Sequence, residues 1–131
     1  MENRISESEW EIMNYLWEKQ ELTQPQLMEL LGSKWNKNTV HTFLSRLCAK
    51  GFVEADKDSV PHRYRPAAAR EECVREERQN FLQRVYQGSV GRMVASFVRD
   101  PGLTKEEIDE LYSIVETLRE EKGKNKTNEQ E

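Results

Sequence analysis

The first third of the chain carries apolar side chains at helical spacing behind two helix-start signals. Ser6 is followed three residues later by Glu9, a capping box that marks a helix N-terminus. The apolar residues after it recur every three or four positions, which predicts an amphipathic helix over residues 6–19. Thr23 and Gln26 repeat the capping box and predict a second, shorter helix.

A third helix is predicted between Asn36, a helix-capping residue type, and Gly51, a helix-ending one. One face of this segment is apolar and the opposite face is small, polar and almost free of acidic residues. The predicted buried positions are Val40, Phe43, Leu44 and Leu47.

Residues 52–56 and 62–66 alternate with the period of two that is typical of strands, and a turn-rich loop at 57–61 separates them. Three helices followed by a two-stranded ribbon is the order of a winged helix-turn-helix domain. We place this domain at residues 4–67.

The rest of the chain predicts three further helices, at about 70–86, 90–98 and 104–121, with a polar tail at 122–131 expected to be disordered. Each helix has one apolar face, and about 55 residues of this kind make a poor independent core, so we expect residues 68–121 to form a homodimer. The residues predicted to form its interface are Phe81, Val85, Val94, Phe97, Ile108, Leu111, Tyr112, Val115 and Leu118.

The fold class that follows is mostly α with a small antiparallel β-wing. An N-terminal winged helix-turn-helix domain precedes a C-terminal three-helix dimerisation domain. Trp10 and Trp17, seven residues apart on one helix face, are predicted core residues. Trp35, in the turn before the third helix, is interpreted as a packing residue, with contact to DNA as the alternative.

Charge is unevenly distributed along the chain. The total is −4, yet residues 34–65 hold seven basic and three acidic side chains, whereas residues 1–33 hold two and seven. Attraction to a polyanion acts at the contacting face rather than through net charge, so an acidic total does not exclude DNA.

The outward face of the third helix carries Asn38, Thr42 and Arg46 four residues apart, which places them on one ridge. Arg favours guanine, Asn favours adenine, and a Thr methyl packs on thymine, so this ridge is suited to reading base edges. Lys37, in the first turn, is suited to a phosphate, and His41 lies at the edge of the ridge. The competing interpretation is an ordinary solvated face.

Arg63 and Arg65 share one face of the second predicted strand, where they could contact a phosphate or the minor groove. The alternative is that they pair with Glu54 or Asp56 across the ribbon.

The sequence contains no motif that indicates catalysis, metal binding or insertion into a membrane. Cys48 and Cys73 lack paired spacing, and neither they nor His41 and His62 form a metal-binding motif, so we expect no metal, cofactor or enzymatic activity. The N-terminal residues lack the apolar region of a signal peptide, and no apolar run reaches membrane-spanning length. We therefore expect a cytoplasmic protein.

Two blocks of sequence resemble a known family. ISESEWEIMNYLW at 5–17 and WNKNTVHTFLSRLCAKG at 35–51 are similar to the penicillinase-repressor family, the BlaI/MecI/CopY type of transcriptional regulator. The resemblance continues through segments 80–89 and 103–111 and covers about residues 5–120.

This resemblance implies a homodimeric repressor whose winged helices bind an inverted repeat with TACA/TGTA half-sites. The genes expected under its control are those of β-lactam resistance or metal homeostasis. The DNA-contacting residues predicted from the ridge, the wing and the resemblance together are Lys37, Asn38, Thr39, His41, Thr42, Ser45, Arg46, Arg63 and Arg65.

Two departures from the family pattern bear on induction. The β-lactam-responsive members are cut at an Asn-Phe bond after signalling by a membrane sensor protease, and the corresponding position here is Ser96-Phe97. The sequence therefore does not decide whether proteolysis relieves repression or whether a membrane sensor protease is a partner. The copper-responsive members carry C-terminal Cys-x-Cys motifs, which this tail lacks. An alternative function is a winged-helix adaptor that binds another protein and no specific DNA.

Overall fold

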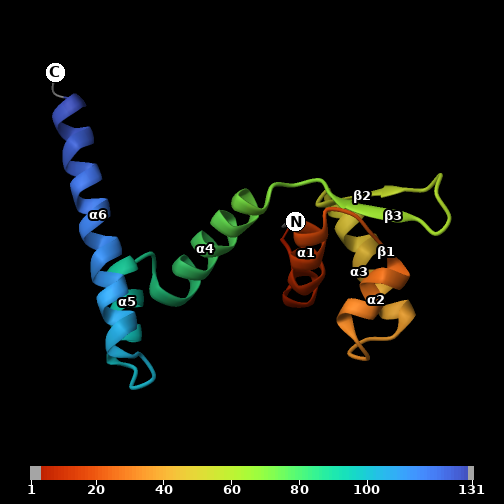
Figure 1. Cartoon of the computed structure of the whole chain (residues 1–131), viewed down its shortest axis with the longest axis horizontal. Helices are drawn as coiled ribbons and strands as arrows, with labels where there is room; N and C mark the ends of the chain where they lie inside the picture. Colours follow the sequence, from red (N-terminus) through yellow and green to blue (C-terminus); the bar gives the residue numbers. More distant parts are fainter. Residues whose placement is uncertain (1–3, 130–131) are drawn as a thin grey trace. The chain divides into compact units, whose positions relative to one another are not determined.

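The computed structural model describes the backbone of residues 4–129 and the side chains of residues 4–124. The chain divides into two compact units, Met1–Glu77 and Arg78–Glu131 (Figure 1). The first unit contains three helices and three short strands. In chain order these are α1 (Glu7–Lys19), β1 (Leu22–Thr23), α2 (Gln24–Leu31), α3 (Lys37–Lys50), β2 (Val53–Asp56) and β3 (Arg63–Pro66).

The helix starts in the first unit are fixed by the side chains that the sequence indicates. The capping boxes of Ser6 with Glu9 and of Thr23 with Gln26 are both formed. Asn36 caps α3 by accepting a hydrogen bond from the Thr39 backbone N–H at 2.8 Å. These bonds satisfy donors that a helix N-terminus otherwise leaves unpaired.

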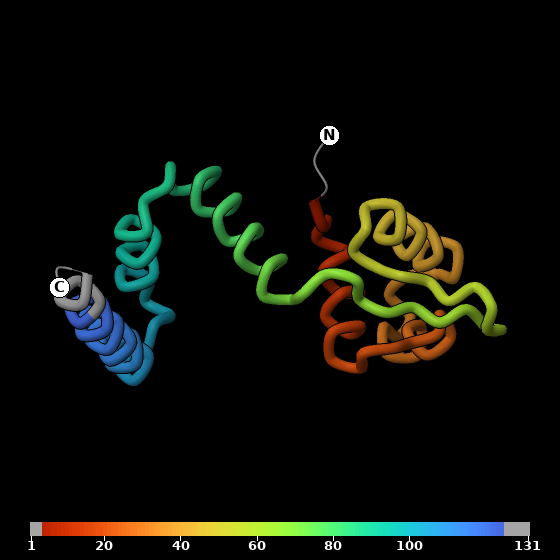
Figure 2. The backbone as a smooth tube through the Cα atoms, turned by 90° about the horizontal axis from the view of Figure 1, so that it is seen from above, coloured from red at the N-terminus to blue at the C-terminus, as the bar shows by residue number. Residues whose placement is uncertain are grey.

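The sheet has three antiparallel strands in the order β1-β3-β2, one more than the predicted two-stranded ribbon. The additional strand is β1, in which Leu22 pairs with Tyr64 and Thr23 pairs with Arg63. A two-residue strand shows no alternation, and its partner lies some forty residues away in sequence, so local pattern does not reveal it. The β2–β3 hairpin forms the wing, and it extends past α2 and α3 in both views (Figures 1 and 2).

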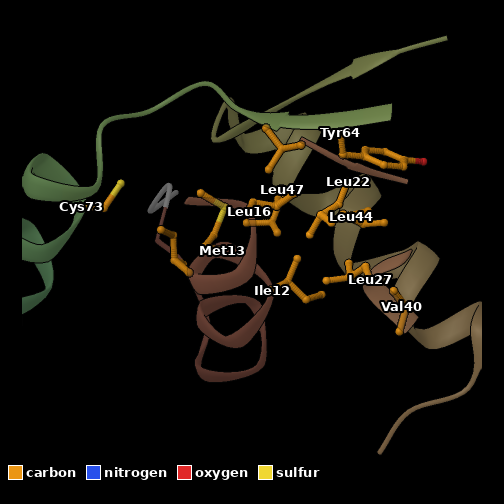
Figure 3. Close-up of a cluster of buried hydrophobic side chains, with 12 residues drawn as sticks. Ile12, Met13, Leu16, Leu22, Leu27, Val40, Leu44, Leu47, Tyr64 and Cys73 are labelled. Atoms are coloured by element: carbon orange, nitrogen blue, oxygen red, sulfur yellow. The ribbon is translucent and has the colours of Figure 1, made fainter. Parts of the chain in front are cut away.

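The core of the first unit lies between α1, α2, α3 and the sheet (Figure 3). Trp10 and Trp17 pack against it from its edge, with their ring centroids 5.6 Å apart. Its fully buried side chains are Ile12, Met13, Leu16, Leu27, Val40, Leu44 and Leu47.

The first unit continues beyond residue 67, where the sequence placed the domain boundary. The Trp17 Nε1–H donates to the Ala68 carbonyl at 2.9 Å, and Cys73, in the first turn of the next helix, is buried in the same core. These contacts attach the start of that helix, α4 (Arg70–Tyr86), to the first unit.

The second unit contains the end of α4 together with α5 (Val90–Arg99) and α6 (Lys105–Glu129). Thr104 begins α6 through the predicted capping box with Glu107. The tail expected to be disordered from residue 122 is instead helical as far as Glu129, and this stretch contains no proline that would stop the helix begun at Lys105. Residues 130 and 131 lie outside the described backbone.

Candidate nucleic-acid interface

The polar ridge of α3 is exposed because the rest of the helix is held from behind. Val40, Leu44 and Leu47 are fully buried, and α3 packs against α1, α2 and β2 through that side. Helical geometry then directs the positions between them to solvent. Six of the seven predicted residues on this helix are exposed: Lys37, Asn38, His41, Thr42, Ser45 and Arg46.

The seventh, Thr39, is half-buried, and its backbone N–H is already bonded to the cap at Asn36. Thr42 donates its hydroxyl proton to the Asn38 carbonyl at 2.9 Å. The methyl group of Thr42 therefore becomes its main contact group toward an incoming ligand. The ridge presents an amide, a methyl group and a guanidinium, which are three of the groups that discriminate base edges.

Two side-chain contacts fix α3 at its N-terminal end. The Gln24 side-chain amide, at the start of α2, donates to the Lys37 carbonyl at 2.8 Å. In the turn between the helices, Trp35 meets Phe43 edge to face with centroids 5.1 Å apart, and the Lys34 ammonium lies 5.0 Å from the Trp35 ring centroid. Trp35 thus has the packing contacts that the sequence interpretation favours.

The C-terminal end of α3 is held by a buried carboxylate. Lys50 Nζ donates to Glu9 Oε1 at 2.7 Å and to the Arg4 carbonyl at 2.8 Å, and Glu9 is 1 % exposed. Burial by itself would raise the pKa of Glu9, but hydrogen bonds from Lys50 and Ser6 outweigh it and hold that pKa below its ordinary value. The charged pair therefore joins the N-terminus of α1 to the end of α3.

Arg63 and Arg65 are exposed on the face of β3 opposite the buried Tyr64. In the sheet register Arg63 lies opposite Asp56 and Arg65 lies opposite Glu54. Arg63 nevertheless forms its ion pair with Glu21, whose Oε2 lies 3.9 Å from the Arg63 Nη1, rather than with Asp56 across the ribbon. Arg63 is therefore partly neutralised from the loop before β1.

A groove of about 560 Å³ lies between the wing and the N-terminal parts of α2 and α3. Among its lining residues is His62, which sequence reasoning considered only as a metal ligand. The signal available was alternation, because His62 lies two residues before the inward-facing Tyr64, directly ahead of β3, and both side chains line the groove. The lining residues are Gln24, Pro25, Met28, Lys37, His41, Val60, Pro61, His62 and Tyr64.

The second unit leaves much of its apolar surface uncovered within one chain. Seven of the nine predicted interface residues are exposed, and Val94 and Leu111 are half-buried. The exposed members of the predicted interface are Phe81, Val85, Phe97, Ile108, Tyr112, Val115 and Leu118.

Ser96 and Phe97, the predicted cleavage position, are exposed on α5. The Ser96 Oγ lies 2.9 Å from the Tyr86 hydroxyl and donates to the Met93 carbonyl at 2.7 Å.

Burial disfavours the charged thiolate form of both cysteines. Burial raises the pKa of both thiols, although Lys57 opposes the shift at Cys48, and Glu76 and Glu72 add to it at Cys73. No group of three potential metal ligands occurs among the described side chains. Between residues 4 and 129, no helix combines the length and apolarity of a membrane span.

The fold and site together define the first unit as a winged helix-turn-helix domain with an exposed, polar second helix of the motif. Residues 5–117 match the model of the penicillinase repressor family, and the chain belongs to that family. It is a family of repressors rather than of enzymes.

Individual relatives cover nearly the whole chain. It is 31 % identical over 113 residues to the methicillin resistance regulatory protein MecI of Staphylococcus aureus, covering 85 % of this chain and 92 % of that one. It is 31 % identical over 115 residues to the penicillinase repressor of Bacillus licheniformis, with 86 % and 90 % covered. Among solved structures, the reduced form of MarR from E. coli matches with a TM-score of 0.47 at 16 % identity, covering 87 % and 77 %.

Proposed function

We propose that this protein is a sequence-specific DNA-binding repressor that acts as a homodimer on an inverted repeat. The observation that carries the proposal is the exposed ridge of Asn38, Thr42 and Arg46 on a helix fixed at both ends. A rigidly held helix with a polar outer face is what insertion into the major groove requires. Membership of the repressor family supports the same function.

In this function α3 lies in the major groove, and each ridge residue reads a base by its own chemistry. Arg46 donates to a guanine, Asn38 exchanges hydrogen bonds with an adenine, and the Thr42 methyl packs on a thymine. Lys37 contacts the backbone, while Thr39, His41 and Ser45 lie within reach of the same groove. Each good base contact contributes about 1–3 kcal/mol of discrimination.

The wing and the second unit complete the proposed mode of binding. Arg63 and Arg65 add attraction toward the phosphate backbone, which is reduced at Arg63 by Glu21. The exposed apolar faces of α4, α5 and α6 associate with those of a second copy, and the two-fold symmetry of that dimer requires a palindromic site. We expect TACA/TGTA half-sites in promoters of resistance or related stress genes.

Selection from randomised duplex DNA tests this function. The full chain is used to enrich a binding site, and the best duplex is then titrated against a scrambled one at two salt concentrations. We expect a palindrome bound about a thousandfold more tightly than the scramble, with affinity falling as salt rises. Enrichment of no duplex, together with no salt-dependent binding, would contradict the proposal and favour the adaptor function.

Relief of repression by proteolysis at Ser96–Phe97 is a separate part of the proposal. Both side chains are exposed, but the bond lies inside α5, so cleavage requires this helix to unwind locally. Incubation with a membrane sensor protease encoded beside the protein, followed by mass determination of the products, tests it. An intact chain after sensor activation would contradict this route of induction.

A further inference from the structure

Arg4, just ahead of α1, is bonded to both α3 and α4. Its backbone carbonyl accepts a hydrogen bond from Lys50 Nζ, at the end of α3, at 2.8 Å. Its guanidinium forms an ion pair with Glu77 on α4, with 3.8 Å between Arg4 Nη2 and Glu77 Oε2. One residue therefore connects the helix that carries the polar ridge to the helix that leads out of the first unit.

The first turns of α4 have one face that is not exposed. Between residues 70 and 80, every side chain is exposed except those of Cys73, Val74 and Glu77. Glu77 is four residues from Cys73 and three from Val74, so the three side chains lie on one face of the helix. Cys73 is 5 % exposed and belongs to the core of the first unit (Figure 3).

Three attachments fix the direction in which α4 leaves the first unit. The Ala68 carbonyl, just before the helix, accepts the Trp17 indole N–H at 2.9 Å. Cys73 is held in the core, and Glu77, about one turn further along, is paired with Arg4. Cys73 and Glu77 are separated by about 6 Å along the helix axis. Two fixed points on a rigid rod define its direction, whereas a single point would allow it to pivot.

The rest of α4 continues this direction as an uninterrupted helix. It extends to Tyr86 and contains neither Gly nor Pro, the residues at which sharp kinks usually occur. Its last turns belong to the second unit, whose apolar faces are proposed to form the dimer. The direction fixed at residues 68–77 therefore constrains how far apart a dimer can hold its two winged helix domains.

We infer that Arg4 and Glu77 are positioning residues that determine which spacing between half-sites the dimer accepts. The inference rests on the proposed function, in which two winged helix domains bind one inverted repeat. One base pair added between the half-sites turns one of them by about 35° and moves it by about 3.4 Å. A dimer whose α4 helices have fixed directions reaches both half-sites at one spacing, whereas pivoting helices follow the change.

The length of the spacer tests the inference. The duplex selected by the full chain is compared with duplexes whose half-sites are closer or further apart by a single base pair, and with a duplex that carries one half-site. In the wild type, the changed spacer is expected to weaken binding about a hundredfold, because the second winged helix no longer binds together with the first. The single half-site gives the affinity of one DNA-binding unit alone.

Charge reversal at either residue replaces attraction by repulsion. Arg4→Glu and Glu77→Arg are each expected to reduce the loss caused by the changed spacer about threefold, which is the scale of a half-buried ion pair at the surface. Both variants should bind the single half-site as the wild type does, because neither residue belongs to the proposed DNA-contacting set. Where a reversal abolishes binding to the single half-site, Glu77→Gln makes the same comparison with a smaller change.

Two controls separate the ion pair from the general effect of charge on DNA affinity. The variant that combines Arg4→Glu with Glu77→Arg restores opposite charges and is expected to recover the wild-type dependence on spacer length. Glu76→Arg makes the same change of charge at an exposed neighbouring position and should keep that dependence.

The outcomes distinguish the inference from the proposed function. If the wild type selects an inverted repeat but both single reversals lose as much affinity on the changed spacer as it does, the inference is wrong and the proposed function stands. The inference is also wrong if Glu76→Arg acts as Glu77→Arg does, or if the combined variant recovers nothing. If the wild type selects no inverted repeat, the proposed function is wrong and the inference with it.

Discussion

The charged side chain of Lys50, at the end of α3, is bonded to other groups of the first unit. Its ammonium group donates to Glu9 and to the Arg4 carbonyl, and its side chain is 26 % exposed. A cation bonded in this way is a poor partner for a phosphate, although Lys50 is one of the seven basic residues between positions 34 and 65. We therefore assign Lys50 to positioning α3 and the DNA contacts to other residues of the helix.

Replacing Glu9 with Gln should make the stability of the first unit less dependent on pH. The pKa of Glu9 is lowered in the folded chain, so its contribution is fully present above the ordinary value of 4.5 and is lost as pH falls through the folded-state pKa. We expect the wild type to lose stability below pH 4.5 more steeply than Glu9→Gln. Near neutral pH the variant should be less stable by about 2 kcal/mol, because a charged hydrogen-bond acceptor is lost.

Urea unfolding of both proteins between pH 3 and pH 7 measures this difference, with the range chosen to span roughly the titration of carboxylic acids. Glu18→Gln is the matched control, because Glu18 is an exposed carboxylate on the same helix. Equal pH dependence in the wild type and Glu9→Gln would show that the titration of Glu9 does not contribute to the pH dependence of stability.

Arg46→Ala should reduce discrimination more than affinity for random DNA. The arginine is exposed on the ridge of α3 and is proposed to donate to a guanine. We expect the preference for the selected duplex over the scramble to fall by about 1–3 kcal/mol. Lys37→Ala is the comparison, since it should weaken binding to both duplexes and reduce the salt dependence by about one phosphate contact. An unchanged ratio in Arg46→Ala would exclude base reading by this residue.

At the scale of elements, α3 begins where a single side chain fixes it. Asn36 accepts the Thr39 N–H at 2.8 Å, so Asn36→Ala leaves that donor without its partner. We expect a loss of about 1 kcal/mol of stability, and Asn36→Ser should restore most of it because serine also caps helices well. Thermal unfolding of the three proteins measures the effect. Equal stability of the alanine and serine variants would show that the cap contributes nothing.

Local sequence signals are sufficient to predict where the helices begin, but they do not predict pairing between elements that are distant in sequence. Ser6, Thr23, Asn36 and Thr104 mark helix starts in the sequence, and all four act as caps because the bonds span only three residues. The strand β1 depends instead on pairing with β3, which only tertiary structure brings alongside.

In the candidate site, too, features within one element are predicted from the sequence, whereas contacts between elements are not. Helical periodicity predicts the ridge of α3, because its buried and exposed faces follow from spacing within one element. The pairing of Lys50 with Glu9 spans 41 positions, and the grouping of His62 with Lys37 requires the wing to lie over α3. Residues that act together across elements are thus missed when each element is interpreted alone.

At the scale of the whole molecule, the second unit holds too little apolar contact of its own. Val115, Leu118 and Tyr112 on α6 are each at least half exposed in the single chain, and such a continuous apolar face typically marks an interface. A second copy supplies an equivalent face without any further component. This is the physical reason for assigning dimerisation to residues of α4, α5 and α6.

Val115→Asp should separate the dimer without disturbing the single chain. The side chain is 55 % exposed in one copy, so a carboxylate there is solvated in the monomer and buried without a partner in the dimer. We expect dimerisation to weaken about a hundredfold or more. Sedimentation measures the mass, for which one chain gives 15.5 kDa. Ser113→Asp, exposed on the other side of α6, is the control and should keep the wild-type mass.

Dimerisation and DNA binding should be coupled through the symmetry of the operator. When one winged helix of a dimer occupies its half-site, the second binds at a high effective concentration, which typically raises the overall affinity by about 10²–10⁴. Val115→Asp should therefore lose affinity by about that factor for the full inverted repeat, yet bind a duplex with a single half-site as the wild type does. Titration of both proteins with both duplexes measures the four affinities. Equal loss on the single half-site would mean that the substitution damages the DNA-binding unit itself, and equal affinity on the full repeat would mean that the two copies bind independently of α6.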